Sequence, residues 1–465
     1  MTALQIFCEN VLCEEETSDQ QRSIILVDVM NVLGFSKSQR EIHIHVIHLQ
    51  NVLMTILRSH DNWTRTIIGS VAEGMCGGIY DNVKHKDYDY LYTNREIKLC
   101  TPHTNYISNP SLLHDNENYK ASCFVEEDDN FPGYVKLSLA EVKANNINWV
   151  HVARMIDDKL YLSNSLIMDS FYKHISVDKL KNVIPLQEDR LLLYIPSFDK
   201  RDKNGPAYTV DYANFYGSTI KTDNVFCIHY DTWPSSANSF ITRRKPNNWP
   251  INSMLENIQS QGCEVAAVGH HDSKTNDIHW RISFPSERSL FLDLTDVQIL
   301  FYALIKKKIL QEKLNTSQRE VVSSFHIKHV MFWCVELCSC QWVDSNYINC
   351  LNICLTKLIQ MIKDRHIPHY IIESRNLFNS KMTEKVSEEI VDVLSKCDTT
   401  RIFTLDAFSH GFEGTHFSNA LLKQECLISI IMACFTFCCG NFSSLCRIPL
   451  YFGIHTYHIM PQKAC

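Results

Sequence analysis

A Gly-Ser pair followed by two alternating aspartates constrains this chain more than any other feature. Gly69 and Ser70 come directly after two isoleucines, and Asp87 and Asp89 alternate with tyrosines further along. Because the side chains of a strand alternate between its two faces, Asp87 and Asp89 are expected on one face of a sheet. Neighbouring carboxylates repel each other, and Mg²⁺ or Mn²⁺, which prefers oxygen ligands, removes that cost. A Gly-Ser turn offers backbone N–H groups and one hydroxyl to a phosphate. Together these residues predict a site for a triphosphate and divalent metal ions.

Each half of this pattern also has an ordinary explanation. A Gly-Ser pair alone is a common turn, and Asp-x-Asp alone is often a solvated strand end. The order and proximity of the two halves favour the site, because nucleotidyltransferases of the polymerase-beta type carry Gly-Ser followed by acid-x-acid on the next strand. The gap between the halves is longer here than is usual in those enzymes. We interpret residues 76–80 as a loop insertion, since loops absorb extra length at a small entropic cost.

The composition is that of a globular protein without a general affinity for polyanions. The 465 residues are 45% hydrophobic and 21% charged, which is enough for a core and for two or three domains. The net charge of −7 means that any nucleic-acid surface must be a local patch. The 19 cysteines lack the spacing of a disulfide framework, which indicates reduced thiols and a cytoplasmic location.

The two ends of the chain are where a targeting or membrane segment would be expected. The first residues lack a basic region before an apolar run, so we expect no signal peptide. The apolar run 426–439 is shorter than the roughly 20 residues of a bilayer-spanning helix, although residues 445–454 could extend it. We expect no membrane span, and the role of residues 397–465 stays open.

The hydrophobic pattern predicts a mixture of strands and helices before residue 250 and mostly helices after it. A helix is expected from Ser36 onward, and a hairpin is expected around Pro132-Gly133, between two β-prone runs within 123–139. Strand-like runs occupy residues 208–212 and 224–230. Further helices are expected at 140–156, 163–176, 251–261, 293–313, 325–339, 344–364 and 381–396.

A two-metal site needs a third carboxylate, because Asp87 and Asp89 alone leave coordination positions open. Asp223, at the start of the second strand-like run, is the best placed, and Asp211 is the second choice. A lone aspartate at a strand start is usually a turn residue. The prediction of Asp223 therefore depends on its context.

Three basic clusters are candidate contacts for phosphates or a polynucleotide. They are Arg243-Arg244-Lys245, Lys306-Lys307-Lys308, and Lys328 beside His326 and His329. The alternative interpretation is that these clusters are solvated helix faces.

The order of the motifs resembles the Mab (Mab-twenty-one) nucleotidyltransferases, which include cyclic GMP-AMP synthase (cGAS) and the cGAS-like receptors of animals. The resemblance covers about residues 40–395. The matching pieces, in the family's order, are Gly69-Ser70-x-x-Glu73-Gly74, Asp87-x-Asp89, Pro132-Gly133-Tyr134, Gly205-Pro206-Ala207, Asp223 with Trp233-Pro234, Trp249-Pro250, Trp280-Arg281-Ile282-Ser283-Phe284, Ser324-Phe325-His326-Ile327-Lys328 and Ile367-Pro368-His369-Tyr370. The Pro-Gly-Tyr hairpin and the Trp-Pro pairs are similar to those of invertebrate cGAS-like members in particular.

This resemblance implies an α+β, bilobed nucleotidyltransferase fold. A mixed sheet like that of polymerase beta carries the carboxylates, a long N-terminal helix lies along its back, and a helical C-terminal lobe closes the cleft. The divisions that follow are an N-terminal extension at 1–35, a nucleotidyltransferase core at 36–250, a helical lobe at 251–396 and a C-terminal extension at 397–465.

The resemblance also implies roles for individual residues. Gly69 and Ser70 would bind the donor triphosphate, while the catalytic residues Asp87, Asp89 and Asp223 would hold two Mg²⁺ or Mn²⁺ ions. The further nucleotide contacts are Arg281 and Ser283 at the base, Lys306 near the triphosphate, Phe325 as a stacking aromatic, and Ser324 and Lys328 in the Ser-aromatic-His-x-Lys run. Cyclic GMP-AMP synthase has Tyr at the position of Phe325, so the stacking face survives here and the hydroxyl does not.

No zinc is expected, because the zinc-binding His-Cys-Cys-Cys insertion of cyclic GMP-AMP synthase is missing. No cysteine lies between Phe284 and Ser323. Cys334, Cys338 and Cys340 fall within a predicted helix without a fourth ligand nearby, and we interpret them as buried thiols.

The sequence therefore predicts a metal-dependent, cGAS-like nucleotidyltransferase that joins ATP and GTP into a cyclic dinucleotide, an innate immune signal, when nucleic acid activates it. Double-stranded RNA is favoured over DNA as the activator, while the nucleic-acid-binding residues, the product linkage and the oligomeric state stay open. Two alternatives also stay open. A catalytically inactive nucleotide-binding or scaffold protein of the same family typically lacks one or more of the carboxylates. An RNA-tailing enzyme such as a poly(A) polymerase shares the Gly-Ser and acid pair but not the Trp-Pro runs.

Overall fold

The computed structural model describes most of the chain between residues 18 and 396. The described ranges are 18–31, 40–41, 44–45, 47–49, 51–52, 63–75, 85–102, 119–143, 148–175, 198–204, 207–213, 219–306 and 314–396. The strands are β1 (Trp63–Ile68), β2 (His85–Asn94), β3 (Ile97–Cys100), β4 (Ala121–Glu127), β5 (Tyr134–Val142), β6 (Ala153–Ile156), β7 (Lys159–Leu162), β8 (Phe198–Asn204), β9 (Ala207–Ala213), β10 (Thr219–Tyr230), β11 (Cys263–Ala266) and β12 (His279–Ser283). The helices are α2 (Asp19–Met30), α4 (Gly69–Ala72), α5 (Asn148–His151), α6 (Asn164–Ile175), α9 (Asn238–Thr242), α10 (Asn252–Ser260), α11 (Glu287–Asp293), α12 (Asp296–Leu304), α13 (Thr316–Val321), α14 (Ser324–Leu337), α15 (Tyr347–Lys363) and α16 (Glu384–Ser395).

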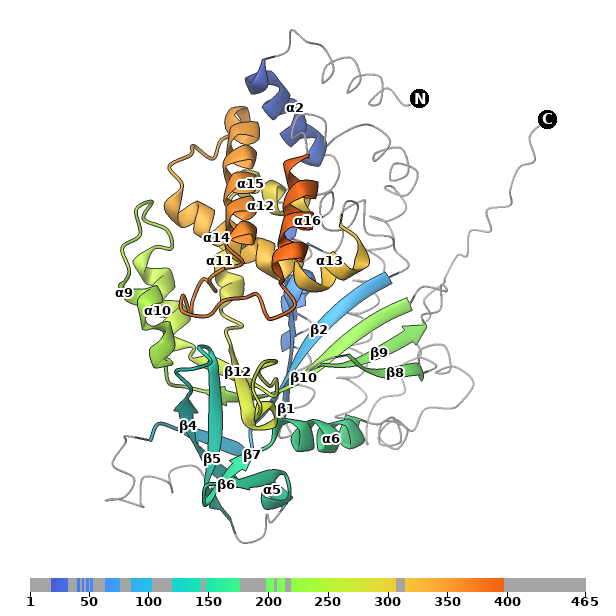
Figure 1. The fold of residues 1–465 in the computed structure, drawn as a ribbon, viewed down its shortest axis with the longest axis vertical. Coiled ribbons are helices and arrows are strands. Elements are labelled where there is room, and N and C mark those ends of the chain that lie inside the picture. The colour runs from blue at the N-terminus through green and yellow to red at the C-terminus, as the bar shows by residue number, and fades with distance from the viewer. Residues whose placement is uncertain are drawn as a thin grey trace, which may run out of the picture.

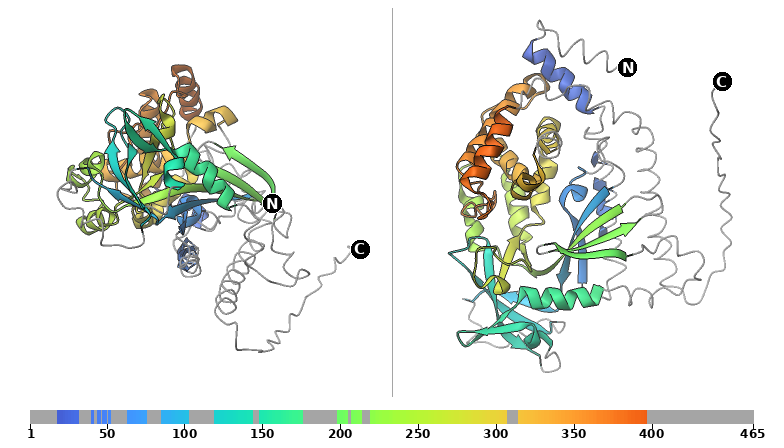
Figure 2. Two further views of the ribbon diagram at one scale, coloured as in Figure 1. Left: turned by 90° about the horizontal axis from the view of Figure 1, so that it is seen from below. Right: turned by 45° about the vertical axis from the view of Figure 1, so that its right-hand side comes forward.

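One mixed sheet joins all twelve of these strands. Its main path is β1-β2-β10-β11-β12-β5-β4-β3, with β8 and β9 joined beside β10, and β6 and β7 beside β5. Most neighbours are antiparallel, but the central strands β2 and β10 run parallel over ten residue pairs. Figure 1 shows α12, α14, α15 and α16 gathered at one end of the molecule and the strands at the other, and Figure 2 shows the same division from two further sides. The predicted mixed sheet with a helical C-terminal region is thus confirmed.

Local sequence signals explain the elements that position the site. On β12 the apolar residues Trp280 and Ile282 are buried, while Arg281 and Ser283 between them are half-buried and share the other face. Helix α14 begins with a capping box in which the side chain of Ser323 and the ring of His326 satisfy backbone N–H groups at the helix start. These signals fix which side chains β12 and α14 present to the site.

A single large apolar cluster runs through the sheet and the helices. It includes Val135 and Phe226 from the strands and Phe291, Phe332 and Tyr370 from the helical part, all essentially buried. Because both parts contribute to one core, burial of apolar surface fixes their relative position. Strands β11 and β12 lie beyond residue 250, so the sheet continues past the boundary placed there from the sequence, and that boundary stays a prediction.

Several expected elements are confirmed and one is wrong. The hairpin around Pro132-Gly133 is formed by β4 and β5, and the helices expected at 163–176, 251–261, 325–339, 344–364 and 381–396 correspond to α6, α10, α14, α15 and α16. Helix α12 accounts for the described part of 293–313. The helix expected at 140–156 is instead the end of β5, the short α5, and β6. The cause is Asp157-Asp158, where both residues have positive φ and close a two-residue turn between β6 and β7.

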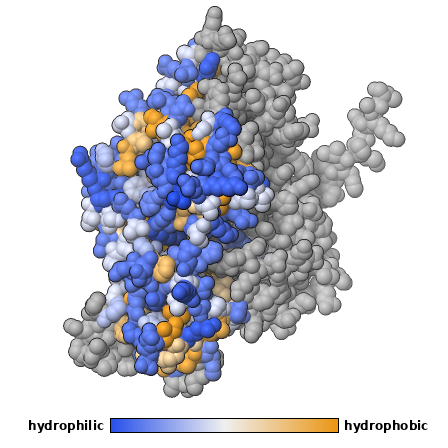
Figure 3. Space-filling view, in the orientation of Figure 1, coloured by the Kyte–Doolittle hydropathy of each residue, from blue (hydrophilic) through white to orange (hydrophobic). Residues whose placement is uncertain are grey.

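Parts of the N-terminal helix and the C-terminal apolar run lie outside the described residues. Within the stretch expected to be helical from Ser36, residues 40–41, 44–45, 47–49 and 51–52 are helical. No helix among the described residues is long and apolar enough to cross a bilayer, and the run 426–439 lies outside them. On the face drawn in Figure 3, hydrophilic residues predominate and apolar residues form small groups.

Candidate nucleotide and metal site

The parallel strands β2 and β10 bring two of the predicted carboxylates together. Asp89 and Asp223 are direct partners in the β2–β10 register, and Asp87 is the partner of Lys221. Partners on adjacent strands project from the same face of the sheet, and so does a residue two positions along the same strand. The backbone therefore places Asp87 on the face that carries Asp89 and Asp223. The side chains of Asp87 and of the second choice, Asp211, lie outside the described part of the structure.

Gly69 allows the carboxylate of Asp89 to approach the start of α4. The residue has φ of 69°, a left-handed conformation that side chains rarely adopt. A Cβ added to Gly69 would also collide with the carboxylate of Asp89, whose oxygen lies directly against this backbone. Two independent constraints therefore require glycine here, and the second leaves room for Asp89 next to the Gly-Ser turn.

Asp223 is oriented by a neighbour that the sequence did not identify. The hydroxyl of Thr209 on β9 donates a hydrogen bond of 2.6 Å to Oδ1 of Asp223. Thr209 is buried and Asp223 is half-buried. This bond fixes one carboxylate oxygen of Asp223. Nothing in the local sequence around Thr209 indicates this hydrogen bond. It follows from the pairing of β9 with β10, in which Thr209 is the partner of Asp223.

Ser70 and Lys306 are 236 residues apart in sequence and meet directly. The ammonium group of Lys306, just after the last turn of α12, donates a hydrogen bond of 2.9 Å to the hydroxyl of Ser70. Both were predicted near the donor triphosphate, and the structure brings them together. A hydroxyl and an ammonium at this distance offer a phosphate two donors from two different parts of the fold.

Lys328 is held between two carboxylates. Its ammonium group lies 2.9 Å from Oε1 of Glu73 and 2.7 Å from Oε1 of Glu287. Burial would lower the pKa of Lys328, but the two carboxylates outweigh it and raise that pKa above its ordinary value. Burial raises the pKa of Glu287. The nucleotide contact predicted for Lys328 stays a prediction, and Glu287 was missed because no short-range pattern links it to Glu73.

The residues predicted at the base lie on β12 and α14. Arg281 and Ser283 are half-buried on one face of β12, and Arg281 pairs across the sheet with Tyr134. Phe325 in the first turn of α14 keeps 38% of its surface exposed and packs edge-on against His329 with ring centroids 4.4 Å apart. Phe325 therefore presents an aromatic surface to solvent, as base stacking requires.

Ser324, the remaining predicted contact, is half-buried beside the phenol of Tyr302, a buried tyrosine of α12. Burial raises the pKa of Tyr302. Ser324 therefore lies where α12 and α14 meet, and Lys306 follows α12 by two residues.

Two of the three residues of the first basic cluster bind internal partners, and the third, Arg244, is exposed. Arg243 forms two 2.9 Å hydrogen bonds to the buried carboxylate of Glu336 and one of 2.8 Å to the carbonyl of Tyr370. Lys245 donates to the carbonyl of Phe240 at 2.7 Å. Lys307 and Lys308 lie outside the described residues. Of the two interpretations weighed for Arg243 and Lys245, neither a solvated helix face nor a polynucleotide contact describes these side chains, which instead bind internal acceptors.

The cysteines of the helical part are thiols without disulfides. Cys334 is buried, and Cys338 and Cys340 are half-buried. Among the described residues, these three sulfurs are not part of any group of converging metal-ligand atoms.

Two family models match consecutive parts of the chain. Residues 111–293 match the Mab-21 protein nucleotidyltransferase domain. Residues 301–396 match the Mab-21 protein HhH/H2TH-like domain. Together the matches cover the strands from β4 to β12, with Asp223 and Thr209, the end of α12, and the helices from α13 to α16.

Proposed function

This chain belongs to the Mab-21 family of nucleotidyltransferase-fold proteins, and from that membership and the geometry of its carboxylates we propose that it is a metal-dependent nucleotidyltransferase. The observation that carries the proposal is the register pair Asp89–Asp223 on the parallel strands β2 and β10, beside the Gly-Ser turn. A protein that only binds a partner has no stability reason to align carboxylates on adjacent strands, because like charges in register repel each other.

The donor set fits divalent metal ions. Asp89 and Asp223 offer hard carboxylate oxygens on one sheet face, with Asp87 on the same face two residues before Asp89. One oxygen of Asp223 is fixed by Thr209, and Asp89 is fixed against Gly69. Bound Mg²⁺ or Mn²⁺ would lower the pKa of an acceptor ribose hydroxyl and neutralise charge on the departing pyrophosphate.

The residues around the carboxylates would bind and orient the nucleotides. Ser70 and Lys306, hydrogen-bonded to each other, would exchange that bond for contacts to the donor triphosphate. Phe325 would stack on a base, and Arg281 with Ser283 would contact base edges from β12. In-line phosphoryl chemistry needs positioning and electrostatic stabilisation more than covalent help, which these groups supply.

We further propose that the product is a cyclic dinucleotide made from ATP and GTP, and that nucleic acid, double-stranded RNA in first place, activates the reaction in the cytoplasm. Support comes from the motifs shared with cGAS-like receptors, among them the Trp-Pro pairs and the run Trp280–Phe284. The 19 cysteines without a disulfide framework support a reducing compartment.

Product analysis tests this function. Purified full chain would be incubated with Mg²⁺ or Mn²⁺, all four labelled nucleoside triphosphates, and a panel of double-stranded RNA and DNA. We expect pyrophosphate release and one small cyclic product in the presence of a nucleic acid, identified by its mass. D89N is the control, and it should lose turnover while the chain stays folded, because neutralising one carboxylate relieves the repulsion between the aligned carboxylates.

Two outcomes would contradict the proposal in different ways. A ladder of extended RNA would identify an RNA-tailing enzyme. The absence of pyrophosphate under every condition of the panel would favour a scaffold protein.

A further inference from the structure

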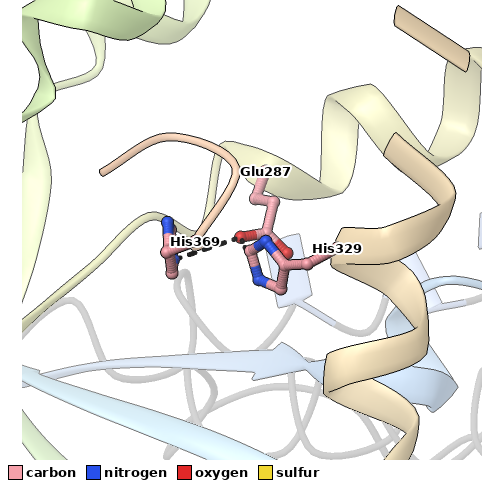
Figure 4. A group of neighbouring side chains, drawn as sticks. All are labelled: Glu287, His329 and His369. Atoms are coloured by element: carbon pink, nitrogen blue, oxygen red, sulfur yellow. Dashed lines mark ion pairs between the residues drawn. The ribbon is translucent and has the colours of Figure 1, made fainter. Parts of the chain in front are cut away.

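A buried cluster beside the proposed site has the composition of a metal centre. Glu287 on α11, His329 on α14 and His369 in the loop before α16 are buried, and one ligand atom from each lies within 4.8 Å of the others. Figure 4 shows the carboxylate of Glu287 between the two imidazole rings. Two histidines and a glutamate are a common ligand set for zinc, so the protonation of the rings decides what the cluster does.

Backbone amides fix the tautomer of both rings. The N–H of Tyr370 donates to Nδ1 of His329 at 2.9 Å, and the N–H groups of Ile371 and Ile372 donate to Nδ1 of His369 at 3.1 Å. A ring nitrogen that accepts a hydrogen bond carries no proton, so each neutral ring carries its proton on Nε2. Burial lowers the pKa of both histidines, which keeps the rings neutral.

Both protonated nitrogens face the same carboxylate oxygen. Nε2 of His329 lies 3.7 Å and Nε2 of His369 lies 3.9 Å from Oε2 of Glu287. The rings therefore direct N–H groups, and not lone pairs, at the centre of the cluster. A metal ion needs the lone pairs, so this arrangement does not build a metal site. At these distances the two N–H groups lie near the carboxylate without hydrogen-bonding to it, and Nε2 of His329 has no hydrogen-bond partner among the described residues.

The other oxygen of Glu287 leads to the Gly-Ser turn. Oε1 lies 2.7 Å from the ammonium of Lys328, which lies 2.9 Å from Oε1 of Glu73. Glu73 directly follows α4, three residues after Ser70. The same helix is held a second time, because Nε of Arg288 donates to the carbonyl of Ala72 at 2.8 Å. Helices α11 and α14 thus hold the end of α4 that lies opposite Gly69.

We propose that Glu73, Lys328 and Glu287 form a strut that positions Ser70 for the donor triphosphate, with the rings of His329 and His369 packed near its far end. Lys328 then acts through Glu73 and does not touch the nucleotide. This inference rests on the proposed function, because it assigns Ser70 to a triphosphate. A buried charge left without its partner is strongly destabilising, so the three charges hold each other in place only as a set.

Binding of a non-hydrolysable ATP analogue with Mg²⁺, measured by calorimetry well below the melting temperature, separates the strut from a direct contact. E73Q keeps the shape and the acceptor oxygen but removes the charge. The strut predicts that E73Q weakens binding of the analogue about tenfold. It also predicts that E73Q adds little to the loss caused by S70A, because Glu73 acts through Ser70.

The matched control is E336Q. Glu336 is also buried on α14, and its carboxylate pairs with Arg243 at 2.9 Å and accepts a hydrogen bond from the phenol of Tyr370 instead of a group near α4. E336Q should lower the melting temperature at least as much as E73Q while changing the dissociation constant of the analogue less than twofold. If E336Q weakened analogue binding as much as E73Q does, the effect of E73Q would be explained by general destabilisation. That result would overturn the inference.

Direct contact between Lys328 and the triphosphate predicts the opposite sign for E73Q. Removal of the competing carboxylate would then leave analogue binding unchanged or tighter, and that result would overturn the strut. Binding losses from E73Q and S70A that simply add would overturn it as well. Stoichiometric binding of Zn²⁺ that is lost in H329Q would show that the cluster is a metal site after all.

Thermal stability tests the strut without any nucleotide. K328M leaves two buried carboxylates facing each other and is expected to be the least stable variant, or to fail to fold. K328M/E73Q removes one of these charges and should be more stable than K328M. A double variant no more stable than K328M would refute the strut. If the double variant is more stable than K328M but the wild-type chain makes no product, the proposed function is refuted and the strut is not.

Discussion

At the scale of single residues, the site depends on backbone positions that tolerate one residue type. Gly69 has φ of 69° and lies against the carboxylate of Asp89, so a side chain there is excluded twice. The sequence indicated Gly69 as a turn residue, and the glycine does form a turn. It could not show that the turn also makes room for Asp89, because that contact depends on the pairing of β1 with β2.

The substitution G69A is expected to abolish turnover, by a factor of at least about 100, because its Cβ would displace the carboxylate of Asp89. The left-handed backbone adds a stability loss of about 1–2 kcal/mol. Turnover and chemical denaturation measure the two effects. G74A is the matched control, since Gly74 has φ of 72° and its Cβ would meet Arg40 and Ile44 instead of a carboxylate. Equal turnover in the two variants would contradict the role given to Gly69.

Thr209 is expected to orient the carboxylate of Asp223 and so to raise the rate of turnover, without being required for it. A hydrogen bond to a charged group contributes about 1.5–3 kcal/mol, so T209V should lower kcat/KM by about tenfold or more. T222V removes another buried threonine hydroxyl from the neighbouring position on β10, whose side chain points to the opposite face. Steady-state kinetics of both variants should show a larger loss for T209V. A loss of the same size in T222V would show that the effect is a general one of strand packing.

At the scale of elements, the sequence predicted those with a strong local pattern and missed those set by distant partners. The apolar periods of α14 and α15 and the Pro-Gly hairpin were sufficient to place these elements. Helix α11 was not predicted, because it is only seven residues long. The buried glutamate at its start, Glu287, pairs with Lys328, which lies 41 positions later in the sequence. The helix expected at 140–156 failed because two consecutive aspartates at positive φ form a turn that periodicity does not detect.

Helix α14 makes stability depend on pH through His326. Nδ1 of His326 accepts from the N–H of Ser323 at 3.1 Å, and Nε2 donates to the carbonyl of Leu377. Burial lowers the pKa of His326 to about 4. The folded state therefore binds this proton less readily than the unfolded state, so the stability contribution is complete above about pH 6.5 and is lost as the pH falls towards 4.

The variant H326Q tests this prediction, because Gln keeps an acceptor at the third helical position and does not titrate. Urea denaturation between pH 7 and pH 5 should show wild-type stability falling with decreasing pH. The slope of the unfolding free energy against pH should be smaller in H326Q than in the wild type, by up to about 1.4 kcal/mol per pH unit. His329 and His369, whose pKa values burial also lowers, should leave a residual slope in the same direction. Identical slopes in both proteins would mean that the pKa of His326 is the same in the folded and unfolded states, and would contradict the prediction.

At the scale of the whole molecule, the fold brings together residues that lie far apart in the chain. Ser70 meets Lys306, Glu73 meets Lys328, and Asp89 meets Asp223, each across a separation that no local pattern encodes. The motif order nevertheless predicted one site for all of these residues except Glu73, because the resemblance to a family carries tertiary information that periodicity lacks. The nucleic-acid surface was not located, since Arg243 and Lys245 bind internal partners.

The central claim is that the carboxylates of β2 and β10 are aligned to bind cations under a triphosphate. Titration of Mn²⁺ in the presence of a non-hydrolysable ATP analogue, followed by electron paramagnetic resonance, tests this claim most directly. We predict about two Mn²⁺ bound per wild-type chain, as a two-metal site requires, and the loss of at least one in both D89N and D223N. Mn²⁺ binding that is the same in all three proteins would contradict the claim.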